Sequence, residues 1–176
     1  MSIVVDTNTM GYVFSPQEGE DDDFSPVRKW LFKGKGRLVI GGSGYMGELR
    51  RVPSSLRVIS ELNKRRKVIR VEDDDVDELE RTVRHIVPPD CDDPHIIALI
   101  GVSRCPLVCT RDKRASNYLK DESLYPWKCF APKIYSSRQN AEALLTDENA
   151  RKAVYTDLSH CPDYRKFIKG CISKTE

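Results

Sequence analysis

The stretch that decides the fold is S-I-V-V-D-T-N-T-M, residues 2–10. Its apolar run from Ile3 to Val5 is β-favouring, short and unbroken, which is typical of a strand buried on both faces. The turn-forming residues behind this run end the strand and place Asp6 at its carboxyl end. Ligands bind at this edge of open α/β sheets, so Asp6 is a candidate site residue, although an acid here can also cap the next helix.

The composition indicates one soluble globular domain. The chain has 176 residues, of which 39% are hydrophobic and 32% charged. No apolar run approaches the roughly 20 residues of a membrane span. The N-terminus has no basic segment followed by an apolar stretch, so we expect a cytoplasmic protein without membrane contact. Six cysteines without paired metal-ligand spacing are expected to be reduced rather than to bind zinc.

The net charge of +2 conceals a local asymmetry. Eight basic residues and one acid lie between Arg50 and Arg70, whereas ten acids and two arginines lie between Glu72 and Asp93. Such stretches can place a phosphate-attracting surface beside a cation-attracting one. The ordinary alternative is that both are solvated helix faces.

Strands alternate with helices along the chain. Apolar, β-favouring runs predict strands at 2–5, 37–40, 67–71, 106–110 and 128–135. Helices are expected at 73–86 and across 90–102, and Ser43 is expected to cap a helix that carries Glu48. This alternation predicts parallel crossover units and therefore an α/β fold, a three-layer α/β/α sandwich around a mostly parallel sheet of about five strands.

The pattern changes to helices alone after residue 146. One helix is expected at 147–158, and an apolar stripe from Tyr164 to Ile172 predicts another. We expect residues 1–145 to form the main domain and residues 146–176 to be a helical extension packed on it. A homodimer or partner interface is the alternative use of the stripe.

Four acids occupy corresponding ends of the expected elements. Asp6 follows the first strand, Glu48 lies on the helix after the second, Asp93 begins the buried helix and Asp112 follows the fourth strand. All four can converge, because strand carboxyl ends and the starts of the following helices share one sheet edge. Gathered carboxylates repel unless they protonate or share a cation, and hard oxygen ligands suit Mg²⁺ or Mn²⁺. Taken singly, each acid also fits a helix cap or a surface residue.

Five segments together carry a family resemblance: V-V-D-T-N (4–8), G-Y-M-G-E-L (44–49), D-D-P-H-I-I-A-L (92–99), L-V-C-T-R-D (107–112) and K-I-Y-S-S-R-Q-N-A-E-A-L (133–144). In order, acids and spacing they resemble the PIN-domain nucleases, notably the toxin-like ribonucleases, over residues 1 to about 145. The resemblance implies a metal-dependent ribonuclease. Asp6, Glu48, Asp93 and Asp112 match the family's acidic tetrad, and Asn8 and Thr110 match supporting polar positions.

The chain departs from the simplest family members in three ways. An acidic loop at 18–23 and the segment after 146 lengthen it. The third acid is also ambiguous, because Asp90, Asp92 and Asp93 compete for the position. Asp93 is preferred for its distance from Ile97 and Ala98, with Asp92 as the alternative.

The resemblance also implies roles and partners. Asp6, Asp93 and Asp112 would hold Mg²⁺ or Mn²⁺ during hydrolysis of RNA, while Glu48 would act as a ligand through water or orient the nucleophile. Basic residues near the acids are expected to bind phosphates of single-stranded or structured RNA: Arg50, Arg51, Arg111, Lys113 and Arg114. A toxin-like member would need an antitoxin or other inhibitor protein, and no residue decides between toxin, processing and defence roles.

Two other functions stay open. V-V-D-T-N-T approximates the pattern of an HAD-like phosphatase, in which a second Asp acts as acid and base two residues after the nucleophile. Asn8 holds that second position, and an amide cannot transfer the proton. The other alternative is a binding module of the same fold without turnover, although the presence of all four acids argues against a decayed site.

Overall fold

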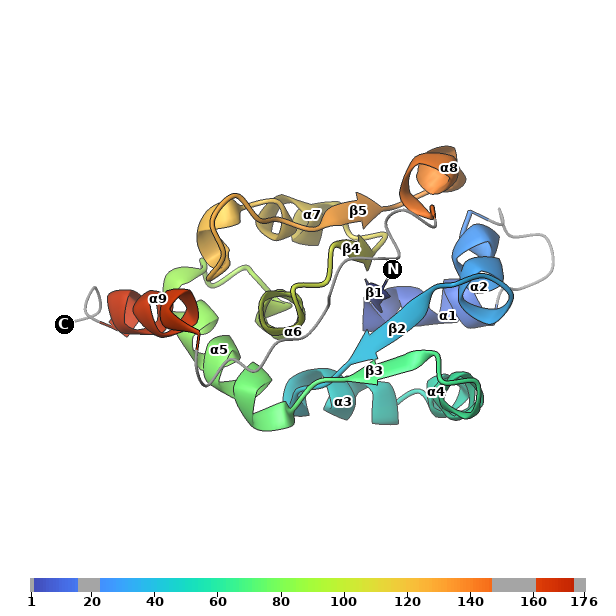
Figure 1. The fold of residues 1–176 in the computed structure, drawn as a ribbon, viewed down its shortest axis with the longest axis horizontal. Coiled ribbons are helices and arrows are strands. Elements are labelled where there is room, and N and C mark those ends of the chain that lie inside the picture. Colours follow the sequence, from blue (N-terminus) through green and yellow to red (C-terminus); the bar gives the residue numbers. More distant parts are fainter. Residues whose placement is uncertain (1, 16–22, 147–160, 173–176) are drawn as a thin grey trace.

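The computed structural model describes residues 2–15, 23–146 and 161–172 (Figure 1). One sheet forms its centre, in the order β3-β2-β1-β4-β5, and every neighbouring pair is parallel. The strands are β1 (Ser2–Val5), β2 (Arg37–Ile40), β3 (Val68–Arg70), β4 (Leu107–Cys109) and β5 (Lys133–Tyr135). The predicted α/β fold with a five-stranded parallel sheet is confirmed.

The central strand β1 is the point where the direction of strand order reverses. The chain builds outward from β1 through β2 and β3, then crosses to β4 and β5 on the other side of β1. Ile3 is in register with Leu38 of β2, and Val4 is in register with Val108 of β4. A reversal of this kind opens a crevice at the carboxyl ends of the two strands, where α/β proteins bind ligands. For this chain, the crevice lies between β1 and β4.

Helices cover both faces of the sheet and complete a three-layer sandwich. In Figure 1, α5 and α6 lie to the left of the sheet and α1 and α2 to its right. The helices are α1 (Met10–Phe14), α2 (Ser25–Phe32), α3 (Ser43–Arg50), α4 (Pro53–Lys64), α5 (Asp73–Ile86), α6 (Pro94–Ser103), α7 (Lys113–Leu119), α8 (Ala141–Leu144) and α9 (Pro162–Ile172). Short 3-10 turns are η1 (Thr7–Thr9), η2 (Glu122–Leu124) and η3 (Arg138–Asn140).

Helix α6 is the buried helix that its apolar sequence predicts. Every residue from Pro94 to Ser103 is buried, because α6 packs against both α5 and β1. Pro94 occupies the first turn, where its missing amide donor costs nothing. Asp93 stands at the N-cap position, but its side chain makes no capping hydrogen bond. The Asp93 carboxylate is therefore not committed to the start of its own helix.

Helix α3 begins differently from the prediction, because Gly42 rather than Ser43 occupies its N-cap position. Gly42 has a φ of 82°, and a Cβ there would lie 2.4 Å from Val76 Cγ1, so the loop after β2 packs tightly on α5. Two carboxylates of α5 accept hydrogen bonds from the backbone amides at the start of α3. Gly42 N donates to Asp73 Oδ1 (2.9 Å) and Ser43 N donates to Asp77 Oδ1 (2.7 Å). The prediction that Ser43 caps this helix was wrong, because the neighbouring helix α5 supplies the acceptors for these amides.

The fifth strand is shorter than predicted. It spans only Lys133–Tyr135, whereas the sequence predicts a strand from residue 128. Cys129 adopts a left-handed backbone with φ of 51°, which breaks an extended chain. Phe130 then packs edge-on against Tyr125, with ring centroids 5.3 Å apart.

The last described helix, α9, packs on α5 (Figure 1). Tyr164 is 5% exposed, and its hydroxyl donates a 3.3 Å hydrogen bond to Asp75 O on α5. Phe167 and Ile168 are partly buried against the same core. Helix α9 therefore packs on α5. The helix predicted at 147–158 and most of the acidic loop at 18–23 lie outside the described residues.

Two expectations from the composition can be compared with the structure. Within 2–15, 23–146 and 161–172, the helices are all too short or too polar to cross a membrane. The thiols of Cys91, Cys105, Cys109, Cys129 and Cys161 are free.

Candidate metal centre

Asp6 is the acid at the carboxyl end of β1, and it is 1% exposed. Its backbone amide donates to Cys109 O (2.9 Å) and so extends the pairing of β1 with β4. Its carboxylate accepts two hydrogen bonds, from Asn8 N to Oδ1 (2.9 Å) and from Thr110 Oγ1 to Oδ2 (2.6 Å). Asp6 thus caps η1 and also lies in the crevice between β1 and β4. The expected cap is confirmed, and the acid also lines a pocket with Asp93 and Asp112.

Thr110 joins the two strands that flank the crevice. It is 1% exposed, and its hydroxyl accepts a 3.0 Å hydrogen bond from Asp112 N while donating to Asp6. Asp112 caps α7 as predicted, since its Oδ1 accepts from Arg114 N (2.7 Å) and Ala115 N (3.1 Å). The cap uses one carboxylate oxygen. Asp112 also lines a pocket together with Asp6 and Asp93.

Burial and mutual repulsion raise the pKa values of two acids of this pocket, Asp93 and Asp6. Burial raises the pKa of Asp93 to about 6, and the negative charges of Asp6, Glu48 and Asp112 add to the rise, while His95 lowers it. Burial also raises the pKa of Asp6. Hydrogen bonds from Thr110 and Asn8 oppose that rise, and the charges of Asp112 and Glu48 add to it. A cation at this place would relieve both the repulsion and the loss of solvation.

The acids that compete for the third position, Asp90, Asp92 and Asp93, all line the pocket, but Asp92 and Asp93 differ in their contacts. The Asp92 carboxylate forms an ion pair with the Arg114 guanidinium, and the two side chains are 61% and 57% exposed. Asp93, by contrast, lies near enough to Asp6 and Glu48 for their charges to raise its pKa. Asp93 is the more buried of the two acids, and its assignment as the third acid stays a prediction.

Glu48 reaches the site from α3. The Thr7 hydroxyl donates a short hydrogen bond to Glu48 Oε2, which also lies 3.3 Å from His95 Nε2. One turn earlier on the helix, the Tyr45 hydroxyl donates a 2.7 Å hydrogen bond to Val5 O at the end of β1. Tyr45 thereby fixes α3 beside Asp6. The four predicted acids lie near one another, because the charges of Asp6, Glu48 and Asp112 all act on Asp93. The residues that line the pocket include Asp6, Asp93 and Asp112 but not Glu48.

His95 is the site residue that the sequence analysis missed. It lies on the first turn of α6 and is 3% exposed. One ligand atom each of Glu48, Asp93 and His95 lie within 4.8 Å of one another, a spacing that a single metal ion can bridge. Two clues were present in the sequence, because His95 directly precedes the apolar run that begins at Ile96 and stands two residues after Asp93. Thr7 was missed as well, although it neighbours Asp6.

Asn8 contacts the site through its backbone, whereas the sequence analysis expected a supporting polar side chain. Asn8 is exposed, and it contacts the site through its backbone amide, which donates a hydrogen bond to Asp6 Oδ1. Thr110, the other predicted supporting residue, contacts the acids through its side chain.

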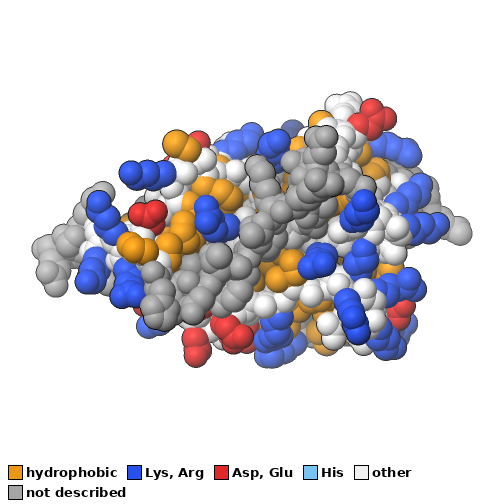
Figure 2. All heavy atoms as spheres, in the orientation of Figure 1, with side chains coloured by type: hydrophobic (Ala, Val, Ile, Leu, Met, Phe, Trp, Pro, Cys, Tyr) orange, Lys and Arg blue, Asp and Glu red, His pale blue; other side chains and the backbone are white. Residues whose placement is uncertain are grey.

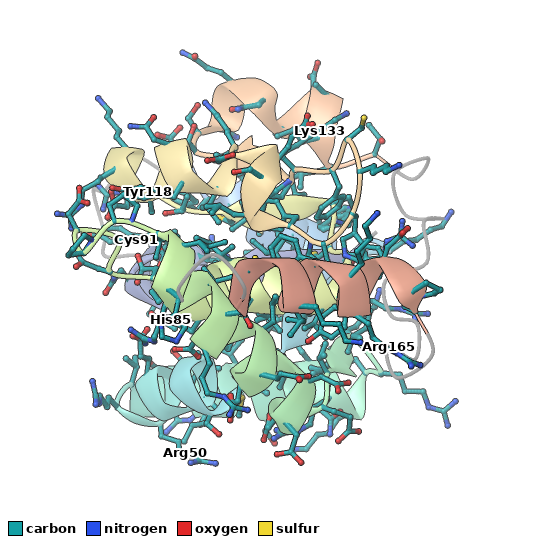
Figure 3. The ribbon with its side chains drawn as sticks, turned by 90° about the vertical axis from the view of Figure 1, so that its left-hand side faces the viewer. Arg50, His85, Cys91, Tyr118, Lys133 and Arg165 are labelled. Carbon is teal, nitrogen blue, oxygen red and sulfur yellow. The ribbon has the colours of Figure 1, made fainter. Side chains whose placement is uncertain are left out.

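The predicted RNA-binding residues are all exposed, and they differ in their surroundings. Arg114 forms the ion pair with Asp92, and the guanidinium of Arg111 lies 3.8 Å from the centre of the Tyr12 ring. Lys113 stands next to Asp112 at the start of α7. Arg50 and Arg51 end α3, and Figure 3 shows Arg50 on the same side of the molecule as Cys91 and Tyr118, which line the pocket.

The longer basic stretch does not form one surface at the acids. Residues 64–67 precede β3 and residues 33–37 lead into β2, so both segments lie at the amino edge of the sheet. The acids lie at the opposite, carboxyl edge. Figure 2 shows many Lys and Arg side chains over the end of the molecule that carries α2 and α4. Of the stretch from Arg50 to Arg70, the residues best placed to flank the acids are those that end α3.

The chain was compared with protein-family models, with curated proteins and with solved structures, and none of them matches it. The assignment of a function therefore depends on the geometry of the site and on the resemblance of its motifs.

Proposed function

We propose that the protein is a metal-dependent endoribonuclease of the PIN-domain type, which hydrolyses RNA phosphodiester bonds with Mg²⁺ or Mn²⁺. The observation that carries the proposal is the convergence of Asp6, Asp93 and Asp112 in one pocket, with Glu48 beside them. The raised pKa values of Asp6 and Asp93 support it, because both carboxylates would gain solvation from a cation.

The donor set fits a hard divalent cation. Asp6, Asp93 and Asp112 offer carboxylate oxygens, which suit Mg²⁺ and Mn²⁺. Cys91 also lines the pocket, but burial raises the pKa of its thiol, so it stays protonated at neutral pH and is a poor ligand. Oxygen ligands without a thiolate argue for the proposed cations over zinc in this pocket.

The protein's own residues would position the reaction. A bound cation supplies Lewis-acid stabilisation of the phosphate and raises the acidity of water. Asp6 is held in one orientation by Thr110 and Asn8, so it presents a fixed carboxylate edge. Glu48 is held by Thr7, and its side chain is 34% exposed, which suits a group that orients the attacking water.

A polyanionic substrate fits the charges around the pocket. Lys113 follows Asp112 directly, and Arg50 and Arg51 follow Glu48, so exposed cations flank the acids from two elements. Such cations bind phosphates on either side of the cleaved bond and steer a negatively charged strand to the site. The choice of RNA rests on the resemblance to the PIN-domain nucleases.

The decisive experiment is cleavage of mixed-sequence, end-labelled RNA by the purified protein with Mg²⁺, Mn²⁺ or a chelator. The wild-type protein should cut RNA only with a divalent ion, and Asp6→Asn should lower the rate at least ~100-fold because a metal-holding group is lost. The matched control is Asp74→Asn, which removes an equal charge from an exposed position in the first turn of α5. It should cut like the wild type.

Two results would overturn the proposal. RNA binding without cleavage under any of these conditions would favour a binding module. Cleavage that survives both Asp6→Asn and chelation would point to another site or to a contaminating nuclease.

A further inference from the structure

We propose that Glu48, Asp93 and His95 form a second cation position, a mixed carboxylate–imidazole site that takes a divalent transition-metal ion in preference to Mg²⁺. The inference deepens the proposed function, and it rests on that function in treating Asp93 as a metal ligand. Asp93 would be shared between this position and the all-carboxylate pocket of Asp6 and Asp112.

The first support is the spacing of the three side chains. One ligand atom from each of Glu48, Asp93 and His95 lie within 4.8 Å of one another. Ligands about 2.0–2.2 Å from a common ion are at most about 4.4 Å apart, so the three side chains would need only a small inward movement to close the site. The three residues come from α3 and from the start of α6, two elements that pack together.

The second support is independent of the acids. His95 is 3% exposed, and its Nε2 is buried without a hydrogen-bond partner among the described residues. Glu48 Oε2 lies 3.3 Å from Nε2, but the contact does not meet hydrogen-bond geometry. A buried polar atom without a partner destabilises the folded protein. A metal ion between the imidazole and the two carboxylates would satisfy it.

The packing of α3 on α6 is adapted to bring these groups together. Gly44 lies one turn before Glu48, and a Cβ there would come within 3.1 Å of His95 Cβ and 3.0 Å of Glu80 Oε2. A glycine inside a helix costs stability, so its presence at this contact agrees with a need for close approach. The close approach allows Glu48 to face the buried imidazole.

The chemistry of the donors sets the preference. Mg²⁺ prefers oxygen ligands and retains much of its water, whereas imidazole nitrogen suits transition metals. A site with one imidazole and two carboxylates therefore discriminates against Mg²⁺ more strongly than the pocket of Asp6, Asp93 and Asp112 does.

The test is pulsed electron paramagnetic resonance of Mn²⁺ bound to the full-length protein, which detects ¹⁴N coupling from a directly bound imidazole. Wild type should show this coupling, and His95→Ala should lose it. By calorimetry, His95→Ala should weaken Mn²⁺ binding by ~10-fold or more while Mg²⁺ binding changes less than ~3-fold. His95→Gln, closer in size, provides the same comparison if the alanine variant folds poorly.

The matched control is His85→Ala, because His85 is exposed on α5 and lies outside the cluster. It should keep both the coupling and the affinity. Absence of ¹⁴N coupling in the wild type, or its persistence in both His95 variants, would overturn the second position.

Failure of this inference is distinguishable from failure of the proposed function. Mg²⁺-dependent RNA cleavage without ¹⁴N coupling would leave the nuclease intact and remove the His95 site. Mn²⁺ with ¹⁴N coupling in a protein that does not cut RNA would keep the His95 site and reject the nuclease.

Discussion

The Thr110 hydroxyl donates a 2.6 Å hydrogen bond to Oδ2 of Asp6, and both residues are 1% exposed. The bond joins the residues that follow β4 and β1, the two strands at which the sheet reverses its order. It also lowers the pKa of Asp6 against the effect of burial. One threonine thus aligns the acid and keeps it more easily ionised.

Replacing Thr110 should make Asp6 harder to ionise and should destabilise the folded protein. Thr110→Val preserves the shape but removes the donor to a buried carboxylate, so the pKa of Asp6 should rise further. The free energy of unfolding at pH 7 should fall by about 1–3 kcal/mol, measured by urea denaturation with a chelator present. Thr110→Ser keeps the hydroxyl and should lose less. Equal losses in the two variants would mean that packing rather than the hydrogen bond matters.

The raised pKa of Asp93 predicts how stability depends on pH in the absence of metal. The folded protein keeps the Asp93 proton up to about pH 6, whereas the unfolded chain releases it near 3.8. Raising the pH through this interval therefore favours the unfolded state. Relative to wild type, Asp93→Asn should gain about 1–2 kcal/mol between pH 4 and pH 7, a range already discounted for partial solvent screening.

The measurement is denaturant unfolding of both proteins in chelator across that pH range. The stability difference between them should widen as the pH rises and level off above about pH 6. A difference that stays constant would show that Asp93 titrates normally in the folded protein.

The two glycines of α3 give a paired test of how closely α3 and α6 pack. A Cβ at Gly44 would press on His95 and Glu80, whereas a Cβ at Gly47 would meet nothing within 4 Å. Gly47→Ala should stabilise the protein by about 0.5–1 kcal/mol through helix propensity alone. Gly44→Ala should gain less and should weaken Mn²⁺ binding, measured by calorimetry. Equal gains and unchanged Mn²⁺ affinity would show that the contact is not constrained.

RNA binding should depend on which edge of the sheet a cation occupies. Lys113 lies beside the acids at the carboxyl edge, whereas Lys64 ends α4 before β3, at the amino edge. Lys113→Ala should reduce the slope of log affinity against log salt by about 0.7 for single-stranded RNA, because one phosphate contact is lost. Lys64→Ala should leave the slope unchanged. Binding measured by fluorescence anisotropy at several salt concentrations would reveal a reversed order.

Local sequence patterns predicted the elements well wherever one periodicity dominated. Helix α5 has the predicted bounds, Asp73–Ile86, because its apolar residues recur at helical spacing between an acidic start and two prolines. β1 and β2 likewise follow from short apolar runs that end in turn-formers. The prediction that the fifth strand begins at residue 128 was wrong, because Cys129 has a left-handed backbone conformation that β propensity does not predict.

The site was predictable only in part, for a different reason. Asp6 and Asp112 could be placed because Asp6 directly follows β1 and Asp112 lies three residues after β4. His95 could not, because its partner Glu48 is 47 residues earlier in the sequence and meets it only where α3 packs against α6. The substitute cap of α3, formed by Asp73 and Asp77 in place of the Ser43 side chain, could not be predicted either, since its acceptors are on another helix.

That substitute cap has a consequence for the G-G-S-G loop after β2. Glycine-rich turns that lead from a strand into a helix are common cradles for nucleotide phosphates, because their amides point at the anion. Here Asp73 and Asp77 already fill this anion hole with carboxylates of the same chain. An incoming phosphate would meet negative charge at the loop, so this glycine-rich turn is closed to nucleotides.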